Sequence, residues 1–141
     1  MFFVAAFTLA LLTPPTQWKP VATQPAKGVE PLGAWVRVSN DPFDRNQSIV
    51  VWRVPFKSTA VEFVAENASP DASWKSGGPL ALCDGLQGVE AVWGRKLKGE
   101  AIDEHSVYAV KDGYAYIATY SHYSSEAEVP AAVAAVRSLC P

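Results

Sequence analysis

The residues best suited to chemistry are Asp103, Glu104, His105 and His122, because a carboxylate beside an imidazole can tune a general base or contribute to a weak metal site. In the strand pairing that the sequence favours, Glu104 and His122 share one sheet face and His105 lies on the other. One histidine and one acid are fewer than the three protein ligands of a catalytic zinc. We therefore expect no metal site and no cofactor, and interpret the cluster as a charged hairpin end that discourages edge pairing.

Nucleophilic catalysis has little support. Ser106 and Ser121 have no positioned base or oxyanion donors in the expected arrangement. The sequence also lacks a G-x-S-x-G elbow, an H-E-x-x-H pair, a P-loop and a G-x-G-x-x-G loop. We expect no catalytic residues and a protein that is not an enzyme. A hydrolase or metal enzyme built on Glu104, His105 and His122 is kept as an alternative.

Four of the five tyrosines lie in the decapeptide YAYIATYSHY, residues 114–123. Tyr114, Tyr116 and Tyr120 alternate with period two and so share one face of the predicted strand, while Tyr108 lies on the preceding strand. A tyrosine has an apolar ring and a polar tip, so an uncovered row could bind a sugar, a peptide or an apolar ring. A covered row would belong to the core. These four tyrosines are the candidate ligand-binding residues.

The turn between these two strands decides which residues share a face. With residues 111–113 as a three-residue loop, Tyr108 pairs with Tyr116 and the tyrosines gather together. A two-residue type I′ loop at residues 112 and 113 shifts the whole register. We favour the three-residue loop because it produces a tyrosine-rich face and an aliphatic face, and we expect the aliphatic face to lie against the C-terminal helix. The aliphatic face comprises Ala115, Ile117 and Thr119.

Strands and helices alternate along the rest of the chain. Strand-forming residues occupy 33–39, 48–54, 89–98, 102–110 and 114–122. A capping box at Thr59 and Glu62 predicts a short amphipathic helix, and the spacing of Val129, Val133, Val136 and Cys140 predicts a helix near the C-terminus, with Cys140 on its apolar stripe. Residues 69–88 are rich in Ser, Pro, Asp and Gly and are expected to be irregular, except that PLALC could be a brief strand or a helical turn.

This order, β-β-α-loop-β-β-β-α, predicts an α+β fold with a mostly antiparallel sheet of about five to six strands, covered by two helices. A composition that is 49% hydrophobic predicts a packed core. The net charge of −2, from 12 basic and 14 acidic residues, is spread without the basic stripe that nucleic acid requires.

The N-terminal part differs from this domain. Residues 1–12, MFFVAAFTLALL, are apolar but shorter than the roughly 20 residues of a bilayer span, as is typical of a signal peptide. An edge strand or core helix is the alternative. We expect residues 1–26 to be a signal peptide and an irregular Pro-rich tail, and residues 27–141 to be one domain. The protein would then be exported, with no stable transmembrane span after leader removal.

Cys83 and Cys140 are the only cysteines in the sequence. An even number in an exported chain favours a disulfide, although two free buried thiols are the alternative. Neither cysteine has a second ligand at a spacing typical of zinc sites.

Short segments, in this order of elements, resemble the PsbP-like fold family and its small exported bacterial proteins. They are LCDG at 82–85, YIATY at 116–120 and LCP at 139–141, and the likeness spans about residues 31–141. The resemblance implies a disulfide between the LCDG and SLCP segments and a role in binding or assembly, and it supplies no functional residue. We therefore expect an exported, non-enzymatic binding or accessory module, whose partner is an unknown protein or envelope component. A small-ligand receptor using the tyrosine face is the second hypothesis.

Overall fold

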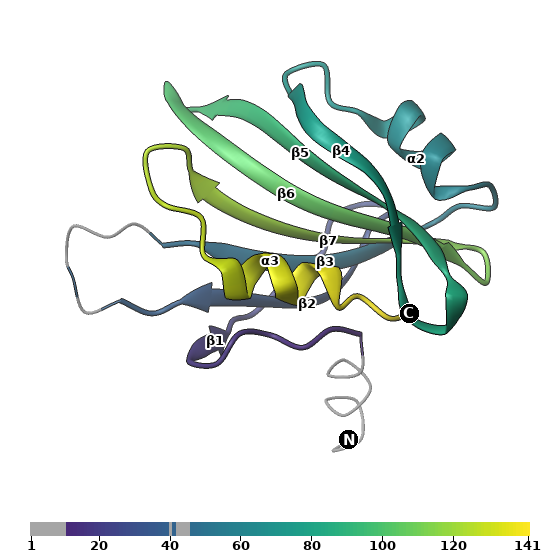
Figure 1. Cartoon of the computed structure of the whole chain (residues 1–141), viewed down its shortest axis with the longest axis horizontal. Coiled ribbons are helices and arrows are strands. Elements are labelled where there is room, and N and C mark those ends of the chain that lie inside the picture. Colours follow the sequence, from purple (N-terminus) through teal and green to yellow (C-terminus); the bar gives the residue numbers. More distant parts are fainter. Residues whose placement is uncertain (1–10, 40, 42–45) are drawn as a thin grey trace.

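The fold is a single antiparallel sheet with helices on both faces, as seen in a computed structural model that describes residues 11–39, 41 and 46–141 (Figure 1). Its seven strands within these residues follow the order β1-β2-β3-β7-β6-β5-β4. The strands are β1 (Trp18–Pro20), β2 (Glu30–Arg37), β3 (Ser48–Pro55), β4 (Ser73–Ala81), β5 (Gln87–Leu97), β6 (Glu100–Lys111) and β7 (Tyr114–Tyr123). The helices are α2 (Ala60–Asn67), η1 (Cys83–Gly85) and α3 (Pro130–Arg137).

The predicted α+β class, the antiparallel sheet and the two covering helices are confirmed, but the strand number is higher than expected. The segment expected to be an irregular tail contains β1, which was missed. The segment expected to be an irregular connection contains β4, which is longer than the brief strand that was left open at PLALC. Both are edge strands, and an edge strand tolerates glycine and proline because one side makes no ladder hydrogen bonds.

Both predicted helices begin where the sequence indicates, but α3 ends at Arg137, so Cys140 lies beyond the helix and not on its apolar stripe. Thr59 caps α2, because its Oγ1 accepts a hydrogen bond from the backbone N–H of Glu62 at 3.2 Å. Pro130 occupies the first turn of α3, where its missing N–H costs nothing. Neither helix, nor any other among the described residues, is long and apolar enough to cross a bilayer.

The face covered by α3 holds the main core. Ala132 and Ala135 of α3 are buried and have small side chains, so the helix can approach the equally small Ala109 and Ala118 of the sheet. The cluster comprises Leu12, Trp35, Ile49, Val51, Val107, Ala109, Ala118, Tyr120, Ala132, Val133, Ala135, Val136 and Leu139.

The face covered by α2 holds a much smaller cluster. Phe63 of α2 packs against Ala115 and Ile117 of β7, and these are the buried members of that cluster. Half-buried side chains surround them, namely Trp52, Val54, Phe56, Tyr108 and Val110.

The turn between β6 and β7 corrects the predicted register. Asp112 and Gly113 both have positive φ, 51° and 84°, which is the geometry of a two-residue type I′ loop. Lys111 therefore pairs with Tyr114, and Tyr108 pairs with Ile117 rather than with Tyr116. The expected orientation of β7 is wrong as a consequence. Ala115 and Ile117 face α2, and Tyr114, Tyr116 and Tyr120 face the side of α3.

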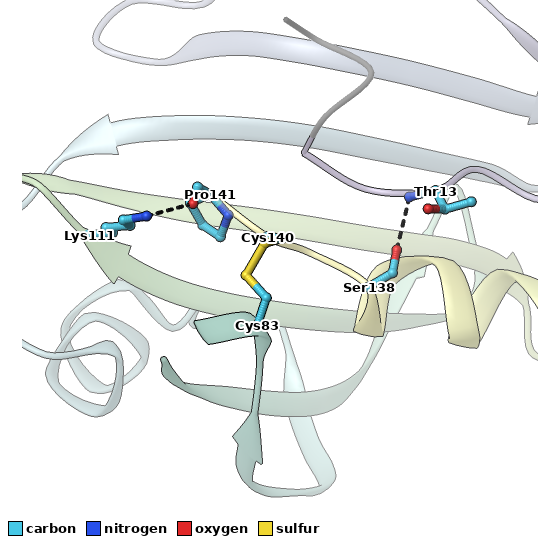
Figure 2. Close-up of a disulfide and its surroundings, with 6 residues drawn as sticks. All are labelled: Thr13, Cys83, Lys111, Ser138, Cys140 and Pro141. Carbon is cyan, nitrogen blue, oxygen red and sulfur yellow. Dashed lines mark hydrogen bonds between the residues drawn. A yellow bond between two sulfur atoms is a disulfide. The ribbon is translucent and has the colours of Figure 1, made fainter. Parts of the chain in front are cut away.

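The predicted disulfide is confirmed. Cys83 and Cys140 are bonded, with 57 residues of sequence separation, and Figure 2 shows the bridge joining the segment after β4 to the segment after α3. Residues 11–13 reinforce this region, because Cys140 N–H donates to the Leu11 carbonyl at 2.7 Å and Thr13 N–H donates to Ser138 Oγ at 2.9 Å. Whether residues 1–26 include a cleaved leader stays a prediction, and residues 1–10 lie outside the described part.

Candidate functional site

A cavity of about 370 Å³ lies between α2 and the sheet. It exists because α2 buries little: of its eight residues, Ala60 and Phe63 are the buried ones. Phe63 stands against Phe56 with ring centroids 5.1 Å apart and against Tyr108 at 6.1 Å, so it holds α2 on the sheet at one point. The lining residues come from α2, the segment after it, strands β3, β5, β6 and β7, and Val29 just before β2.

The cavity has apolar walls and a polar patch. Its aromatic and aliphatic lining includes Trp52, Val54, Phe63, Val64, Trp93 and Ile117. The polar patch comprises Glu104, Ser106, Tyr108 and Thr119. A mostly apolar cavity with a few convergent polar groups is the usual form of a small-molecule site.

Hydrogen bonds fix the polar patch in place. Trp93 Nε1–H donates to the Tyr108 hydroxyl oxygen at 3.0 Å, so the Tyr108 hydroxyl keeps its own hydrogen for another acceptor. Burial raises the pKa of Tyr108, which keeps the hydroxyl protonated. Ser106 Oγ and Thr119 Oγ1 are hydrogen-bonded to each other at 2.8 Å.

Glu104 lies at the rim of the cavity with its charge already paired. Arg95 Nε–H donates to Glu104 Oε1 at 2.8 Å, and Nη2 donates to Oε2 at 3.4 Å. The carboxylate is therefore neutralised by a guanidinium in a bidentate arrangement. The site presents polar atoms without presenting a free charge.

The four predicted ligand-binding tyrosines are divided by the sheet. Tyr108 lines the cavity on the α2 face. Tyr120 is 0% exposed on the α3 face, where its hydroxyl donates to Gln47 Oε1 and accepts from Val129 N–H. Tyr114 and Tyr116 lie half-buried on the same face as Tyr120. The shared platform expected from the sequence therefore does not form.

Arg53 occupies the surface beside Tyr114 and Tyr116. Its guanidinium lies 4.0 Å from the centroid of the Tyr114 ring, and its Nη1 donates to the Tyr116 hydroxyl at 3.3 Å. Hydrogen bonds from Arg53 to Glu30 and Tyr116 raise the pKa of the guanidinium. These rings are thus engaged by a cation of the same chain.

The charged residues at the other end of β6 are also arranged differently from the prediction. Glu104 pairs with Ser121 and faces the cavity, whereas His105 pairs with Tyr120 and His122 pairs with Asp103 on the α3 face. The two histidines therefore share a face, and Glu104 lies on the opposite one. The expected proximity of Glu104 to His122 is wrong, because it depended on the three-residue loop.

Several cavity residues were not identified from the sequence as a site. Trp52 and Trp93 lie in the predicted strands at 48–54 and 89–98 and were not singled out as ligand-binding residues, and Thr119 was placed against the C-terminal helix. The available signal was the Asp-Gly turn, since its two-residue register puts Ser106, Tyr108 and Thr119 on one face.

Comparisons with solved structures show where this fold occurs. The chain resembles PA94 of Pseudomonas aeruginosa, a protein of unknown function, with a TM-score of 0.56 and 12% identity over 77% of this chain and 85% of that one. It also resembles LpqN of Mycobacterium tuberculosis, described as involved in cell envelope biogenesis, with a TM-score of 0.53 and 15% identity over 82% and 71% of the two chains.

No protein-family model and no curated protein matches the chain. The resemblance to the PsbP-like family is not confirmed by these comparisons. At 12% and 15% identity, the structural likeness shows a shared α+β fold.

Proposed function

We propose that this protein is a non-enzymatic binding module that holds a small, largely apolar ligand in the cavity between α2 and the sheet. One observation carries the proposal: aromatic walls enclose a fixed patch of hydroxyl groups in a volume of about 370 Å³. That volume lies near the lower end of the roughly 300 to 1,000 Å³ range of ligand pockets. The site replaces the tyrosine platform expected from the sequence and retains Tyr108 from it.

The lining defines the chemistry of the ligand. Trp52, Phe63 and Trp93 offer ring faces and edges, which favour a cyclic or aromatic group. The Tyr108 hydroxyl offers one hydrogen to an acceptor, and the Ser106 and Thr119 hydroxyls offer further polar contacts. A neutral ring-bearing molecule with one or two hydroxyl or carbonyl groups satisfies both requirements.

A binding role is supported over a catalytic one by the separation of reactive groups. Ser106 and Thr119 are bonded to each other, and no histidine or lysine is among the described residues that line the cavity. His105 and His122 lie on the opposite face of the sheet. A serine nucleophile needs a base within hydrogen-bond reach, and the sheet separates the two.

Export and an envelope setting are part of the same proposal. A disulfide persists in oxidising compartments, and the apolar N-terminal segment has the length of a signal-peptide core. LpqN, a structural neighbour, is described as acting in cell envelope biogenesis. We propose a PsbP-like accessory module whose macromolecular partner is a protein or another envelope component.

The proposal is tested by filling the cavity. Val64 lines it from α2, so Val64→Trp would occupy the volume, whereas Val61 on the same helix is 66% exposed and Val61→Trp is the matched control. The probe is 2-naphthol, a two-ring compound with one hydroxyl, titrated into ¹⁵N-labelled protein. We expect saturable shifts around Ser106, Tyr108 and Thr119 in wild type and in Val61→Trp, and loss of these shifts in Val64→Trp.

A hydroxyl control separates the cavity from the opposite face. Tyr108→Phe should weaken 2-naphthol binding several-fold, whereas Tyr116→Phe should leave it unchanged because Tyr116 lies across the sheet. Binding that survives Val64→Trp, or shifts that centre on the α3 face, would contradict this assignment.

A further inference from the structure

Two buried histidines and one carboxylate converge on the α3 face of the sheet. His105 and His122 are 5% and 6% exposed. Glu128, in the segment between β7 and α3, places Oε2 3.7 Å from His105 Nδ1 and 4.0 Å from His122 Nε2. The corrected register of β6 and β7 brings the two rings to this face, so the sequence prediction of no metal site has to be reconsidered.

The partner of His105 determines which ring nitrogen carries its hydrogen. His105 Nε2 lies 2.6 Å from Glu90 Oε2, and a carboxylate only accepts, so Nε2 is the donor. Glu90 is held by Arg137 through two hydrogen bonds. Burial raises the pKa of Glu90, but the hydrogen bonds from Arg137 and His105 outweigh it and keep the pKa below its ordinary value. Neutral His105 therefore has its lone pair at Nδ1.

This His105 Nδ1 is buried and has no hydrogen-bond partner. A buried polar atom without a partner costs about 1 to 3 kcal/mol, and such atoms are rare in native structures. The atom is directed at the space in front of Glu128. Its position thus requires a physical explanation.

His122 is held in the same way, but its donor is Nδ1 and its lone pair is on Nε2, the reverse of His105. His122 Nδ1 lies 2.9 Å from the Tyr123 carbonyl oxygen, which only accepts, so Nδ1 is the donor and Nε2 has the lone pair. That Nε2 is the atom nearest to Glu128. Both imidazoles are therefore fixed with their lone pairs directed at one carboxylate.

We propose that His105 Nδ1, His122 Nε2 and the Glu128 carboxylate form a binding site for a divalent transition-metal ion of the zinc type. The two imidazole lone pairs and the Glu128 carboxylate repel one another when no cation is present. A bound cation would neutralise this repulsion. Histidine ligands of metals almost always donate the other ring N–H to a carboxylate or a backbone carbonyl. His105 does so to Glu90 and His122 does so to Tyr123. Two imidazoles and one carboxylate are a donor set that zinc accepts, with a fourth position for water.

Metal binding requires the three donors to move closer together. Zinc–ligand bonds of about 2.0 to 2.2 Å place neighbouring tetrahedral donors roughly 3.3 Å apart, shorter than the 3.7 and 4.0 Å separations from Glu128 Oε2 to the two rings. The remaining separation, between His105 Nδ1 and His122 Nε2, exceeds 4.8 Å, because the donor triads within that limit among the described residues are limited to Cys83, Asp84 and Cys140. Binding therefore requires the two imidazoles to approach each other, in addition to a movement of the half-exposed Glu128 toward them.

The experiment is a titration of the oxidised chain with Zn²⁺ and Co²⁺. We expect one ion per chain by calorimetry and a tetrahedral Co²⁺ absorption spectrum. In ¹⁵N spectra of the imidazoles, Zn²⁺ should shift His105 Nδ1 and His122 Nε2 and not the other two ring nitrogens. This readout is specific to the site and independent of the cavity, which lies across the sheet.

Variants identify the ligands. Glu128→Gln should weaken Zn²⁺ binding at least tenfold, and His122→Gln should abolish it. Glu66→Gln removes the same charge from an exposed position on α2 and should change nothing. If His122→Gln fails to fold, Glu128→Gln still tests the proposal. The Glu128 side chain is 48% exposed and outside the core, so this variant should fold.

The carboxylate that accepts from His105 Nε2 provides a further check. Glu90→Gln should weaken binding by about 10 to 100-fold through loss of the His105 tautomer, although Glu90 does not touch the ion. Failure of the chain to bind Zn²⁺ up to millimolar concentration would overturn the proposal, as would binding that is unaffected by Glu128→Gln. Ring nitrogens that respond to protons and not to Zn²⁺ would assign the cluster to proton binding and also overturn it.

Discussion

The two faces of the sheet differ in how completely they are filled. On the α3 face, alanines of the helix lie against alanines of the strands, and thirteen buried residues form one cluster within the described part of the chain. On the α2 face, three buried residues form the cluster, and a cavity of about 370 Å³ remains beside them. One sheet thus supports a closed core and an open site. The reason is that α3 is held on the sheet at several points, whereas α2 is held mainly through Phe63.

The attachments of the helices explain this difference. The C-terminal end of α3 is followed by the disulfide at Cys140 and by a backbone hydrogen bond to Leu11. The helix α2 has no covalent attachment of this kind within the described residues. We infer that stability resides mainly on the α3 face and ligand access on the α2 face.

Removing the disulfide should have the largest effect. The double variant Cys83→Ser, Cys140→Ser opens a loop of 57 residues and should lower the free energy of unfolding by about 4 kcal/mol. Urea unfolding measures the loss, and thiol titration of unreduced, denatured wild type should find no free thiol. Hydrogen exchange should accelerate in α3 more than in α2. Equal acceleration in both helices would remove the proposed asymmetry.

Matched isoleucines on opposite faces compare the packing directly. Ile49 on the α3 face is 0% exposed and Ile117 on the α2 face is 2% exposed. Ile49→Ala should cost about 4 kcal/mol because it creates a void in a filled core. Ile117→Ala should cost about 2 kcal/mol because it enlarges a cavity that already exists. Chemical denaturation of both variants gives the difference, and a larger cost for Ile117→Ala would reverse the comparison.

The hydroxyls of Tyr120 and Tyr108, one on each face, offer a subtler comparison. Tyr120→Phe leaves Gln47, which is 0% exposed, and Val129 N–H without their partner and should cost about 1 to 3 kcal/mol. Tyr108→Phe removes the acceptor of Trp93 Nε1–H beside the cavity, where water can replace it, and should cost under about 1 kcal/mol. Thermal unfolding of the two variants tests whether Tyr120→Phe loses more stability than Tyr108→Phe.

The smallest effect concerns acid stability. The lowered pKa of Glu90 means that its carboxylate stabilises the folded state at pH values above the unfolded pKa of about 4.3, and that this contribution is lost as pH falls through the folded pKa. Glu90→Gln should therefore reduce the change in urea midpoint between neutral and strongly acidic pH. Asp103 also has a lowered pKa, so part of the acid dependence should remain. Glu66→Gln is the control.

Most of the fold could be predicted from the sequence, but the two edge strands, β1 and β4, could not. Apolar periodicity identified α2, α3 and the central strands, because each buries a continuous face. The strand β4 escaped detection because its sequence, SWKSGGPLA, contains two glycines and a proline and has a largely exposed burial pattern. Such a strand depends on pairing with β5 rather than on its own propensity.

The candidate sites depended on a single residue. Asp112 adopts a positive φ, so the hairpin loop has two residues instead of three. That one-residue difference moved Tyr108 away from the other tyrosines and placed His105 on the same face as His122. The cavity could not be predicted from the sequence. A void results from how α2 packs against the sheet, and it has no sequence pattern of its own.

The disulfide also determines how the molecule carries mechanical load. Tension applied from the N-terminal side to Pro141 passes from Cys83 to Cys140 through the sulfurs, so the intervening elements β5, β6, β7 and α3 are shielded (Figure 2). Pulling on the oxidised chain would extend β1 to β4 and α2 alone. Reduction would release the 57-residue ring, adding roughly 200 Å of extended chain. Six of the fifteen residues that line the cavity, and both histidines, thus belong to the part of the protein that force does not reach.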